Sequence, residues 1–192
     1  MATQVTVRPA EDGDLPAILA IYNDAVLTTT ATYDTEPEPL AKRASWLADR
    51  RAQHMPVLVA VSKDSVVGFA ALSPYSPKPG YRHTVSNTVY VAAGARGEGI
   101  GTALLAALVR RAREMGAHVI LASIDAENLA SVALHRSAGF RKVAHFHEVG
   151  HKFGRWLDVV HMQLTLDEPE PLSKYARRAP SRSTGVPTGR SP

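Results

Sequence analysis

The chain has 192 residues, 45% of them hydrophobic, and no cysteine. This fits one globular domain, favours a cytoplasmic location, and excludes disulfides, thiolate metal sites and a cysteine nucleophile. The net charge of +4 arises in residues 171–192, which hold five basic residues and no acid, so the remaining chain carries about −1 and gives no reason to expect a nucleic-acid partner. We also expect no membrane partner, because the sequence shows neither a spanning apolar run nor a signal peptide.

The first part of the chain predicts a strand, two helices and a loop. Residues 5–8 alternate as a strand does, and Asp12 and Asp14 suit the start of the helix that follows. The polar segment 28–39 contains two prolines and predicts a loop. A second helix is expected over 40–53. Its expected inward face is made of Leu40, Ala44, Leu47 and Ala48.

The middle and last parts predict a sheet with two further helices. Three prolines and a glycine in 73–83 require a loop, which leads directly into a strand over 84–91. We assign residues 1–166 to one domain and expect 167–192, which is rich in proline, arginine and serine, to be disordered. The other expected strands are 57–61, 66–72, 119–124, 140–149 and 156–166. The other expected helices are one that follows the glycine turn 94–101 and ends at Gly116, and one over 128–138.

A glycine-rich turn between strand 84–91 and the following helix is the most informative stretch. The unpaired N–H groups at a helix start suit an anion, and glycines allow its close approach. Neither the triphosphate-loop pattern nor the dinucleotide fingerprint fits here. The pattern that does fit is Arg96-x-x-Gly99-x-Gly101.

This turn resembles the acetyl-CoA pyrophosphate loop of the GCN5-related N-acetyltransferase (GNAT) superfamily. The expected order of elements, β-α-α-β-β-β-α-β-α-β-β, is that of the same superfamily, and so is Asn128-x-x-Ser131-x-x-x-His135 followed by Gly139-Phe140. The segments 22–26, 84–91 and 150–158 resemble the phosphinothricin and methionine sulfoximine N-acetyltransferase family. The resemblance implies an α/β fold in which helices flank both faces of a twisted mixed sheet.

The resemblance implies an enzyme that uses acetyl-CoA as cosubstrate, works as a homodimer and needs no metal. A backbone N–H at the end of the fourth strand polarises the thioester in this superfamily, and the glycine turn holds the pyrophosphate. The implied cofactor-binding residues are Val89, Tyr90, Val91, Arg96, Gly97, Glu98, Gly99, Ile100, Gly101, Thr102 and Asn128.

The implied catalytic residues depart from the family pattern. Relatives carry a glutamate, read as a base or a water-holding group, at the position of Ser86, and a serine hydroxyl cannot serve as a base unaided near neutral pH. We therefore expect His135 to be the main acid/base, with water held by Ser86 and Thr88. On its position alone, His135 would be a structural helix histidine.

The implied substrate is an amino-acid-like amine such as phosphinothricin, methionine sulfoximine or methionine sulfone. Its carboxylate needs a cation, and the loop before strand 84–91 offers Lys78 and Arg82, although these cations suit a solvated loop equally. Relatives often have Trp-Arg where this chain has Tyr75-Ser76, so one guanidinium is missing. The expected substrate-binding residues are Ser76, Pro77, Lys78, Tyr81, Arg82, Ser86, Asn87 and Thr88.

Two other functions remain open. The loss of the glutamate at Ser86 favours a CoA-binding sensor or interaction module with weak or no catalysis. An acetyltransferase for peptides or polyamines ranks below both, since a polyamine site needs acids and the 73–83 loop has none. His145 and His147 have the spacing of a metal pair on one strand face, but no third ligand follows at a suitable spacing. We therefore expect these to be surface or hydrogen-bonded histidines.

Overall fold

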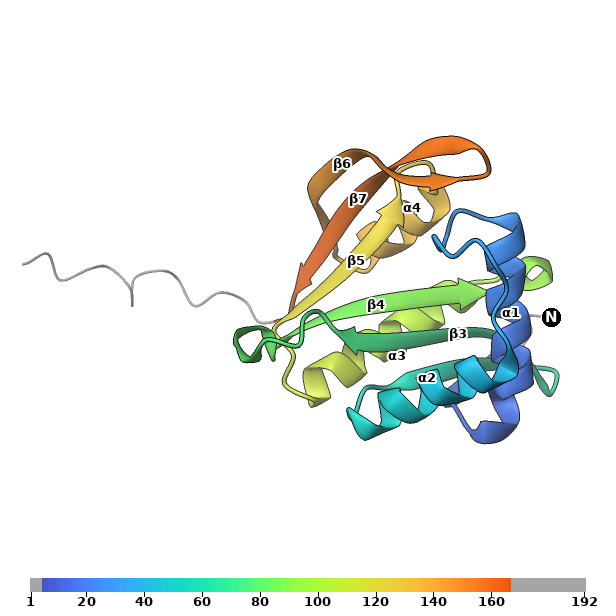
Figure 1. Ribbon diagram of the computed structural model, residues 1–192. Helices are drawn as coiled ribbons and strands as arrows, with labels where there is room; N and C mark the ends of the chain where they lie inside the picture. Colours follow the sequence, from blue (N-terminus) through green and yellow to red (C-terminus); the bar gives the residue numbers. More distant parts are fainter. Residues whose placement is uncertain (1–4, 167–192) are drawn as a thin grey trace, which may run out of the picture.

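The computed structural model describes residues 5–166 as one seven-stranded mixed sheet with helices on both faces (Figure 1). The sheet order is β1-β2-β3-β4-β5-β7-β6, and every neighbouring pair is antiparallel except β4 and β5. The strands are β1 (Thr6–Pro9), β2 (Val57–Ser62), β3 (Ser65–Pro74), β4 (Thr84–Val91), β5 (Val119–Asp125), β6 (Arg141–Lys152) and β7 (Arg155–Thr165). The helices are α1 (Leu15–Thr28), α2 (Leu40–Ala52), α3 (Ile100–Glu114) and α4 (Leu129–Ser137). The predicted fold class and element order are confirmed.

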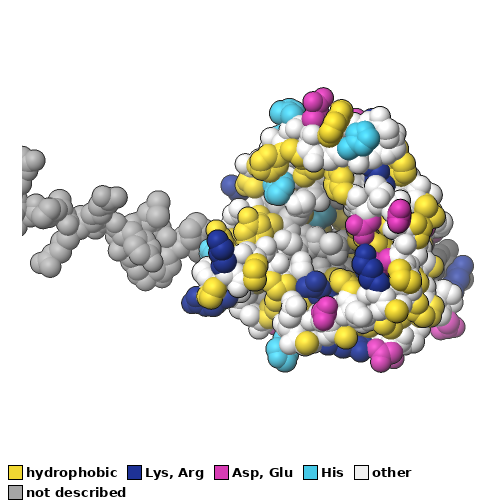
Figure 2. All heavy atoms as spheres, in the orientation of Figure 1, with side chains coloured by type: hydrophobic (Ala, Val, Ile, Leu, Met, Phe, Trp, Pro, Cys, Tyr) yellow, Lys and Arg dark blue, Asp and Glu magenta, His cyan; other side chains and the backbone are white. Residues whose placement is uncertain are grey.

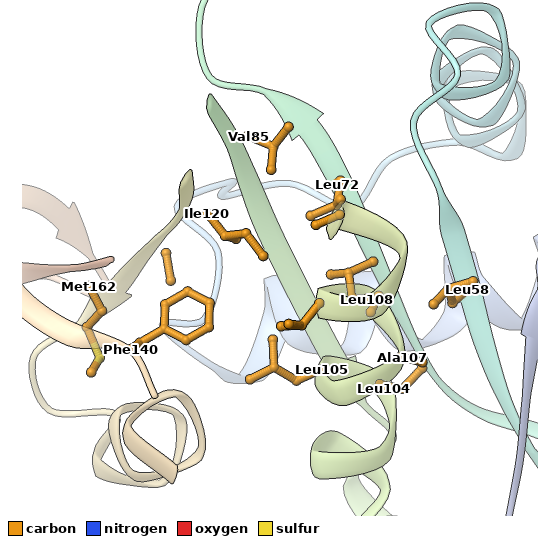
Figure 3. Close-up of a cluster of buried hydrophobic side chains, with 14 of the residues drawn as sticks. Leu58, Leu72, Val85, Leu104, Leu105, Ala107, Leu108, Ile120, Phe140 and Met162 are labelled. Atoms are coloured by element: carbon orange, nitrogen blue, oxygen red, sulfur yellow. The ribbon is translucent and has the colours of Figure 1, made fainter. Parts of the chain in front are cut away.

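Side chains alternate across the strands and so divide the core into two layers. On one face, Val59 of β2 and Phe69 of β3 pack with α1 and α2. On the other face, Leu58 and Leu72 from the same two strands pack against α3. This second layer continues past α3 to the late strands, and Figure 3 shows its main members from α3, β2 to β5, β7 and the turn before β6. Those labelled are Leu58, Leu72, Val85, Leu104, Leu105, Ala107, Leu108, Ile120, Phe140 and Met162.

The inward face of α2 differs from the predicted one. Leu40 and Ala48 are exposed, whereas Arg43 is 4% exposed. The Arg43 guanidinium pairs with the Glu38 carboxylate and lies 3.9 Å from the ring centre of Tyr22. A search for apolar periodicity misses such a residue, because a buried arginine becomes acceptable only when a carboxylate and aromatic rings accompany it.

The hairpin of β6 and β7 is longer than predicted. The segment expected to join the strands is mostly strand, since Gly150 pairs with Leu157 and Lys152 pairs with Arg155. Phe153 and Gly154 make the turn with positive φ angles of 52° and 74°. Paired positive φ values are the geometry of tight hairpin turns, and a bulky residue in the first position conceals this turn from sequence reasoning.

The predicted tail, 167–192, lies outside the described residues. Within residues 5–166, no helix has both the length and the apolar character needed to cross a bilayer.

Candidate active site

The central feature of the site is a gap between the parallel strands β4 and β5. They pair only from Thr84 to Ser86 on β4 and from Val119 to Leu121 on β5, although both strands continue for several residues. Figure 1 shows the two strands diverging beyond this point, and Figure 2 shows a hollow on this side of the molecule. Backbone groups of both strands that face the gap lack a sheet partner within the described chain, so they are available to a ligand.

The glycine turn lies at the open end of this gap. Gly97 and Gly99 have φ angles of 82° and 79°, a conformation that side chains disfavour, and α3 begins directly after Gly99. Ala103 N–H bonds back to the Gly99 carbonyl at 3.0 Å. Within the described chain, the N–H groups just before Ala103 have no such carbonyl partner, and they form the positive end of the helix.

The remaining residues of the predicted cofactor loop surround this helix start. Arg96 is exposed, and its Nε donates to the Val91 carbonyl at 3.3 Å, which keeps the guanidinium beside the end of β4. Glu98 and Thr102 are also exposed, whereas Ile100 is buried in the core layer. The loop therefore offers backbone N–H groups and one cation to an anion, while Ile100 serves packing.

Asn128, the predicted pantetheine contact, caps α4. Its side-chain oxygen accepts the Ser131 N–H at 3.0 Å. This cap fixes the start of the helix that carries His135. The side-chain oxygen of Asn128 is thereby used, and its amide N–H₂ is the part that remains for a ligand.

The two faces of β4 separate the residues that the sequence analysis grouped together. Asn87 points to the α3 and α4 face, where it meets His135. By strand alternation, Ser86 and Thr88 point to the opposite face, together with Tyr90, which packs with the α1 and α2 layer. Water held by Ser86 and Thr88 therefore cannot link His135 to a substrate, and Asn87 does not share a face with the other expected substrate contacts.

His135 is 3% exposed, and both of its ring nitrogens are engaged. Its Nδ1 donates to the Ser131 carbonyl at 2.8 Å, and its Nε2 accepts from the Asn87 amide at 2.9 Å. Burial lowers the pKa of His135, with the Ser131 carbonyl acting in the opposite direction. A neutral ring held in this way has no free nitrogen for a substrate amine, so the geometry favours a role in positioning Asn87.

This buried imidazole predicts a specific pH dependence of stability. The unfolded chain takes up a proton on His135 below about pH 6.5, whereas the folded chain resists it, so acid favours unfolding. We expect the free energy of unfolding to fall between pH 6.5 and 5.5 by about 1 kcal/mol more in the wild type than in His135→Gln, measured by urea titration.

The exposed His54 provides the control for this measurement, because its ring lies outside the core. His54→Asn is expected to keep the wild-type pH dependence, and asparagine tolerates the positive φ of this position. Equal slopes for the wild type and His135→Gln would exclude a neutral, buried role for His135.

The connection between α1 and α2, residues 29–39, lies on the side of the site next to α1. The sequence predicted only a loop for this segment. Lys152, which is 3% exposed, donates from Nζ to the carbonyls of Thr29 and Thr32 at 2.9 and 2.8 Å. The Tyr33 ring lies against Gly150, where an added Cβ would approach it to 2.1 Å. The only sequence signal was that Gly150 and Lys152 belong to the 150–158 segment of the family resemblance.

Two further contacts hold this connection against the diverging strands. The Thr30 hydroxyl donates to the buried carboxylate of Asp125 at the end of β5. The Tyr90 hydroxyl of β4 donates to the Ala31 carbonyl at 3.3 Å. The connection thus contacts both sides of the gap at its open end, where Figure 1 shows it beside β4 and β5.

The loop expected to bind substrate, residues 73–83, lies at the end where β4 and β5 are still paired. Ser86 pairs with Ser73 of β3, so the 73–83 loop begins beside it. Neither Lys78 nor Arg82 pairs with a carboxylate within the described chain, and both are exposed. The rings of Tyr75 and Tyr81 meet edge to face at 5.3 Å. The structure therefore places two exposed cations and two packed tyrosine rings in the loop between β3 and β4. Ser76 and Pro77 belong to the same loop.

A separate pocket of about 450 Å³ lies between α2, β2 and the end of α3. Arg51, His54, Met55, Arg111 and Met115 are among its lining residues, and it includes none of the predicted site residues.

Residues 18–140 match the Acetyltransferase (GNAT) family. The chain belongs to the GNAT acetyltransferase family. It is 47% identical over 163 residues to an L-methionine sulfoximine/L-methionine sulfone acetyltransferase of Pseudomonas aeruginosa, a match that covers 84% of this chain and 95% of that protein.

Solved structures of other GNAT acetyltransferases agree with this fold. A ribosomal-protein-alanine N-acetyltransferase from Brucella melitensis is 49% identical with a TM-score of 0.82, covering 83% of this chain and 99% of that one. A phosphinothricin acetyltransferase from Sinorhizobium meliloti in complex with acetyl-CoA is 36% identical with a TM-score of 0.83, covering 86% and 89%. The GNAT fold is therefore established for this chain.

Proposed function

We propose that this GNAT protein transfers the acetyl group of acetyl-CoA to the α-amine of an amino-acid-like molecule such as methionine sulfoximine, methionine sulfone or phosphinothricin. The observation that carries the proposal is the gap between β4 and β5 with the glycine turn at its mouth. The names of the relatives at 47% and 36% identity support the substrate class.

Acetyl-CoA fits the groups that this region offers. The N–H groups from Gly97 to Thr102 and the Arg96 guanidinium suit the pyrophosphate. The Asn87 Oδ1 is a buried acceptor without a partner in the described chain, which suits an amide N–H of the pantetheine arm. Backbone N–H groups of Val89 to Val91 that face the gap suit the developing oxyanion of the thioester.

The reaction needs a proton acceptor, and we propose His161 of β7 for this role. The amine nitrogen attacks the thioester carbonyl, the C–S bond breaks, the CoA thiolate leaves, and one amine proton must be removed. His161 pairs with Ser123 of β5, and strand register places both on the same face as Ser86. Its Nε2 makes one long contact, 3.4 Å to the Ser123 hydroxyl, so the ring is less committed than His135.

The substrate carboxylate has two candidate partners in the loop beside Ser86. We propose that Arg82 and Lys78 bind it, because both are exposed cations without a carboxylate partner among residues 5–166. Tyr75 and Tyr81, whose rings meet edge to face, belong to the same loop. A carboxylate held at this end directs the α-amine of a small amino acid toward the vertex of the gap.

A substrate panel tests the proposed function. CoA release is measured with methionine sulfoximine, methionine sulfone, phosphinothricin, common amino acids, a polyamine and a peptide with N-terminal alanine. Turnover is expected with the first group, with KM raised by about tenfold in Arg82→Gln through loss of one charge-assisted bond. Turnover only on the peptide would favour the activity in the name of the Brucella relative. Acetyl-CoA binding without turnover would favour a CoA-binding module.

We also propose that the chain forms a homodimer through the β6 and β7 hairpin. Apolar side chains gather there in exposed positions, and Trp156 is 63% exposed. The other members are Val143, Phe146, Val149 and Phe153.

The cytoplasmic location expected from the lack of cysteine stays a prediction.

Sedimentation velocity tests the dimer. Val143→Asp places a charge on the exposed edge strand and is expected to yield a monomer, whereas Leu40→Asp, at an exposed leucine of α2, keeps the dimer. A monomeric wild type at micromolar concentration would rule out this assembly.

A further inference from the structure

The β6 and β7 hairpin carries a cluster of two histidines and one aspartate outside the active site. His145 and His147 come from β6, and Asp158 comes from β7. One nitrogen of each ring and one carboxylate oxygen lie within 4.8 Å of one another. We propose that this cluster binds a divalent transition-metal ion of the Zn²⁺ or Ni²⁺ class.

The spacing of the three ligand atoms suits one ion. The Asp158 Oδ2 lies 2.9 Å from the His145 Nε2 and 2.8 Å from the His147 Nδ1. Two ligands that each lie about 2.1 Å from an ion, at angles of about 90° to 109°, are roughly 3.0 to 3.4 Å apart. The two distances to Asp158 thus lie within a few tenths of an ångström of those around an ion, and the two histidine nitrogens lie within 4.8 Å of each other.

The backbone holds the cluster in place before any ion arrives. The β6 register shifts between Phe146 and Gly150, and Glu148 within this bulge has a φ of 53°. The Glu148 N–H donates to the Asp158 Oδ1 at 2.9 Å. That bond orients the carboxylate, because it occupies one oxygen and leaves the other facing both rings.

In the single chain, the cluster is open to solvent. The His147 side chain is 74% exposed, and those of His145 and Asp158 are each 31% exposed. Two imidazoles and one carboxylate form the ligand set of many open transition-metal sites, in which water completes the coordination.

Lys142 is expected to weaken binding of the ion, so a variant without its charge tests the proposal. Its Nζ lies 3.1 Å from the His145 Nδ1, where the ammonium donates to an unprotonated nitrogen. When the Nε2 of a neutral imidazole binds an ion, the proton moves to Nδ1 and the ammonium loses its acceptor. Removing the Lys142 charge is expected to strengthen binding, an effect that a cluster joined only by hydrogen bonds would not show.

Titration calorimetry of the full chain, without an affinity tag and freed of metal, tests the proposal with ZnCl₂. One Zn²⁺ per chain is expected, with affinity about 100-fold weaker in Asp158→Asn and in His145→Asn, and about tenfold stronger in Lys142→Gln. His151→Asn, on the same hairpin but outside the cluster, should match the wild type. Circular dichroism confirms that each variant is folded.

Two further measurements test metal binding independently of calorimetry. Zn²⁺ should raise the melting temperature of the wild type and not that of Asp158→Asn, and Co²⁺ should develop visible absorption bands only with an intact cluster. No binding at 1 mM ZnCl₂, or binding unchanged in Asp158→Asn, overturns the proposal. Neither outcome affects the proposed acetyl transfer, since these assays contain no substrate.

Discussion

Gly101→Asp is expected to raise the dissociation constant of acetyl-CoA by about 1,000-fold. The substitution places a carboxylate at the start of α3, where the free N–H groups suit a pyrophosphate. Two like charges about 4 Å apart near a protein surface repel by roughly 4 kcal/mol, which corresponds to three powers of ten in affinity. Calorimetric titration with acetyl-CoA measures the change.

Two control variants separate charge from shape. Gly101→Ala tests the added Cβ alone, which would meet the Leu134 side chain at 3.2 Å, and it is expected to weaken binding by less than about tenfold. Gly94→Ala lies in the same turn, with no atom within 4 Å of the added Cβ, and should bind normally. An affinity loss shared equally by Gly101→Ala and Gly101→Asp would remove the electrostatic explanation.

Ser86→Glu is expected to raise kcat by about tenfold, which is less than the roughly 10²- to 10⁴-fold that a positioned general base supplies alone, because His161 already accepts the proton in the wild type. Ser86 is the last β4 residue paired with β5, so a longer side chain there projects from the vertex of the gap. It points to the face that carries His161 rather than to the face of His135. Initial rates with methionine sulfoximine at saturating acetyl-CoA measure the effect.

Variants that lack His161 test the two proton acceptors separately. His161→Phe alone should lower kcat by about 100-fold if its imidazole accepts the proton. Adding Ser86→Glu should then restore turnover, whereas Ser86→Gln, which has the same shape without a basic carboxylate, should not. Wild-type rates in His161→Phe would reject His161 as the base, and rates in Ser86→Glu equal to those in Ser86→Gln would reject the carboxylate.

The sequence predicted the elements and the cofactor turn well because both depend on local patterns. Periodicity gave the strand and helix order, and the positive φ angles of Gly97 and Gly99 agree with the expected phosphate-type turn. The predicted contact between His135 and a substrate is not supported, because both ring nitrogens bond to Asn87 and Ser131. Strand alternation alone could have warned that Asn87 and Ser86 face opposite sides, but which face meets α4 is decided by tertiary packing.

The missed residues share a physical reason. Lys152 and Asp125 can be buried because Thr32 and Thr30 supply hydrogen-bond partners. Those partners lie far along the chain, and polar residues carry no periodic signal that marks them. Asp158 likewise joins His145 and His147 only through the pairing of β6 with β7. Sequence spacing alone therefore indicated a histidine pair without its third member.

The bonds of Lys152 to Thr29 and Thr32 span 123 and 120 residues, and this separation sets an order of assembly. During synthesis, α1 leaves the ribosome early, yet the connection after it cannot be fixed until the β6 and β7 hairpin has emerged. Closing so long a loop is slow relative to forming the local contacts of α3. The connection between α1 and α2 is therefore expected to be among the last parts of the site to be fixed, after the glycine turn and α3.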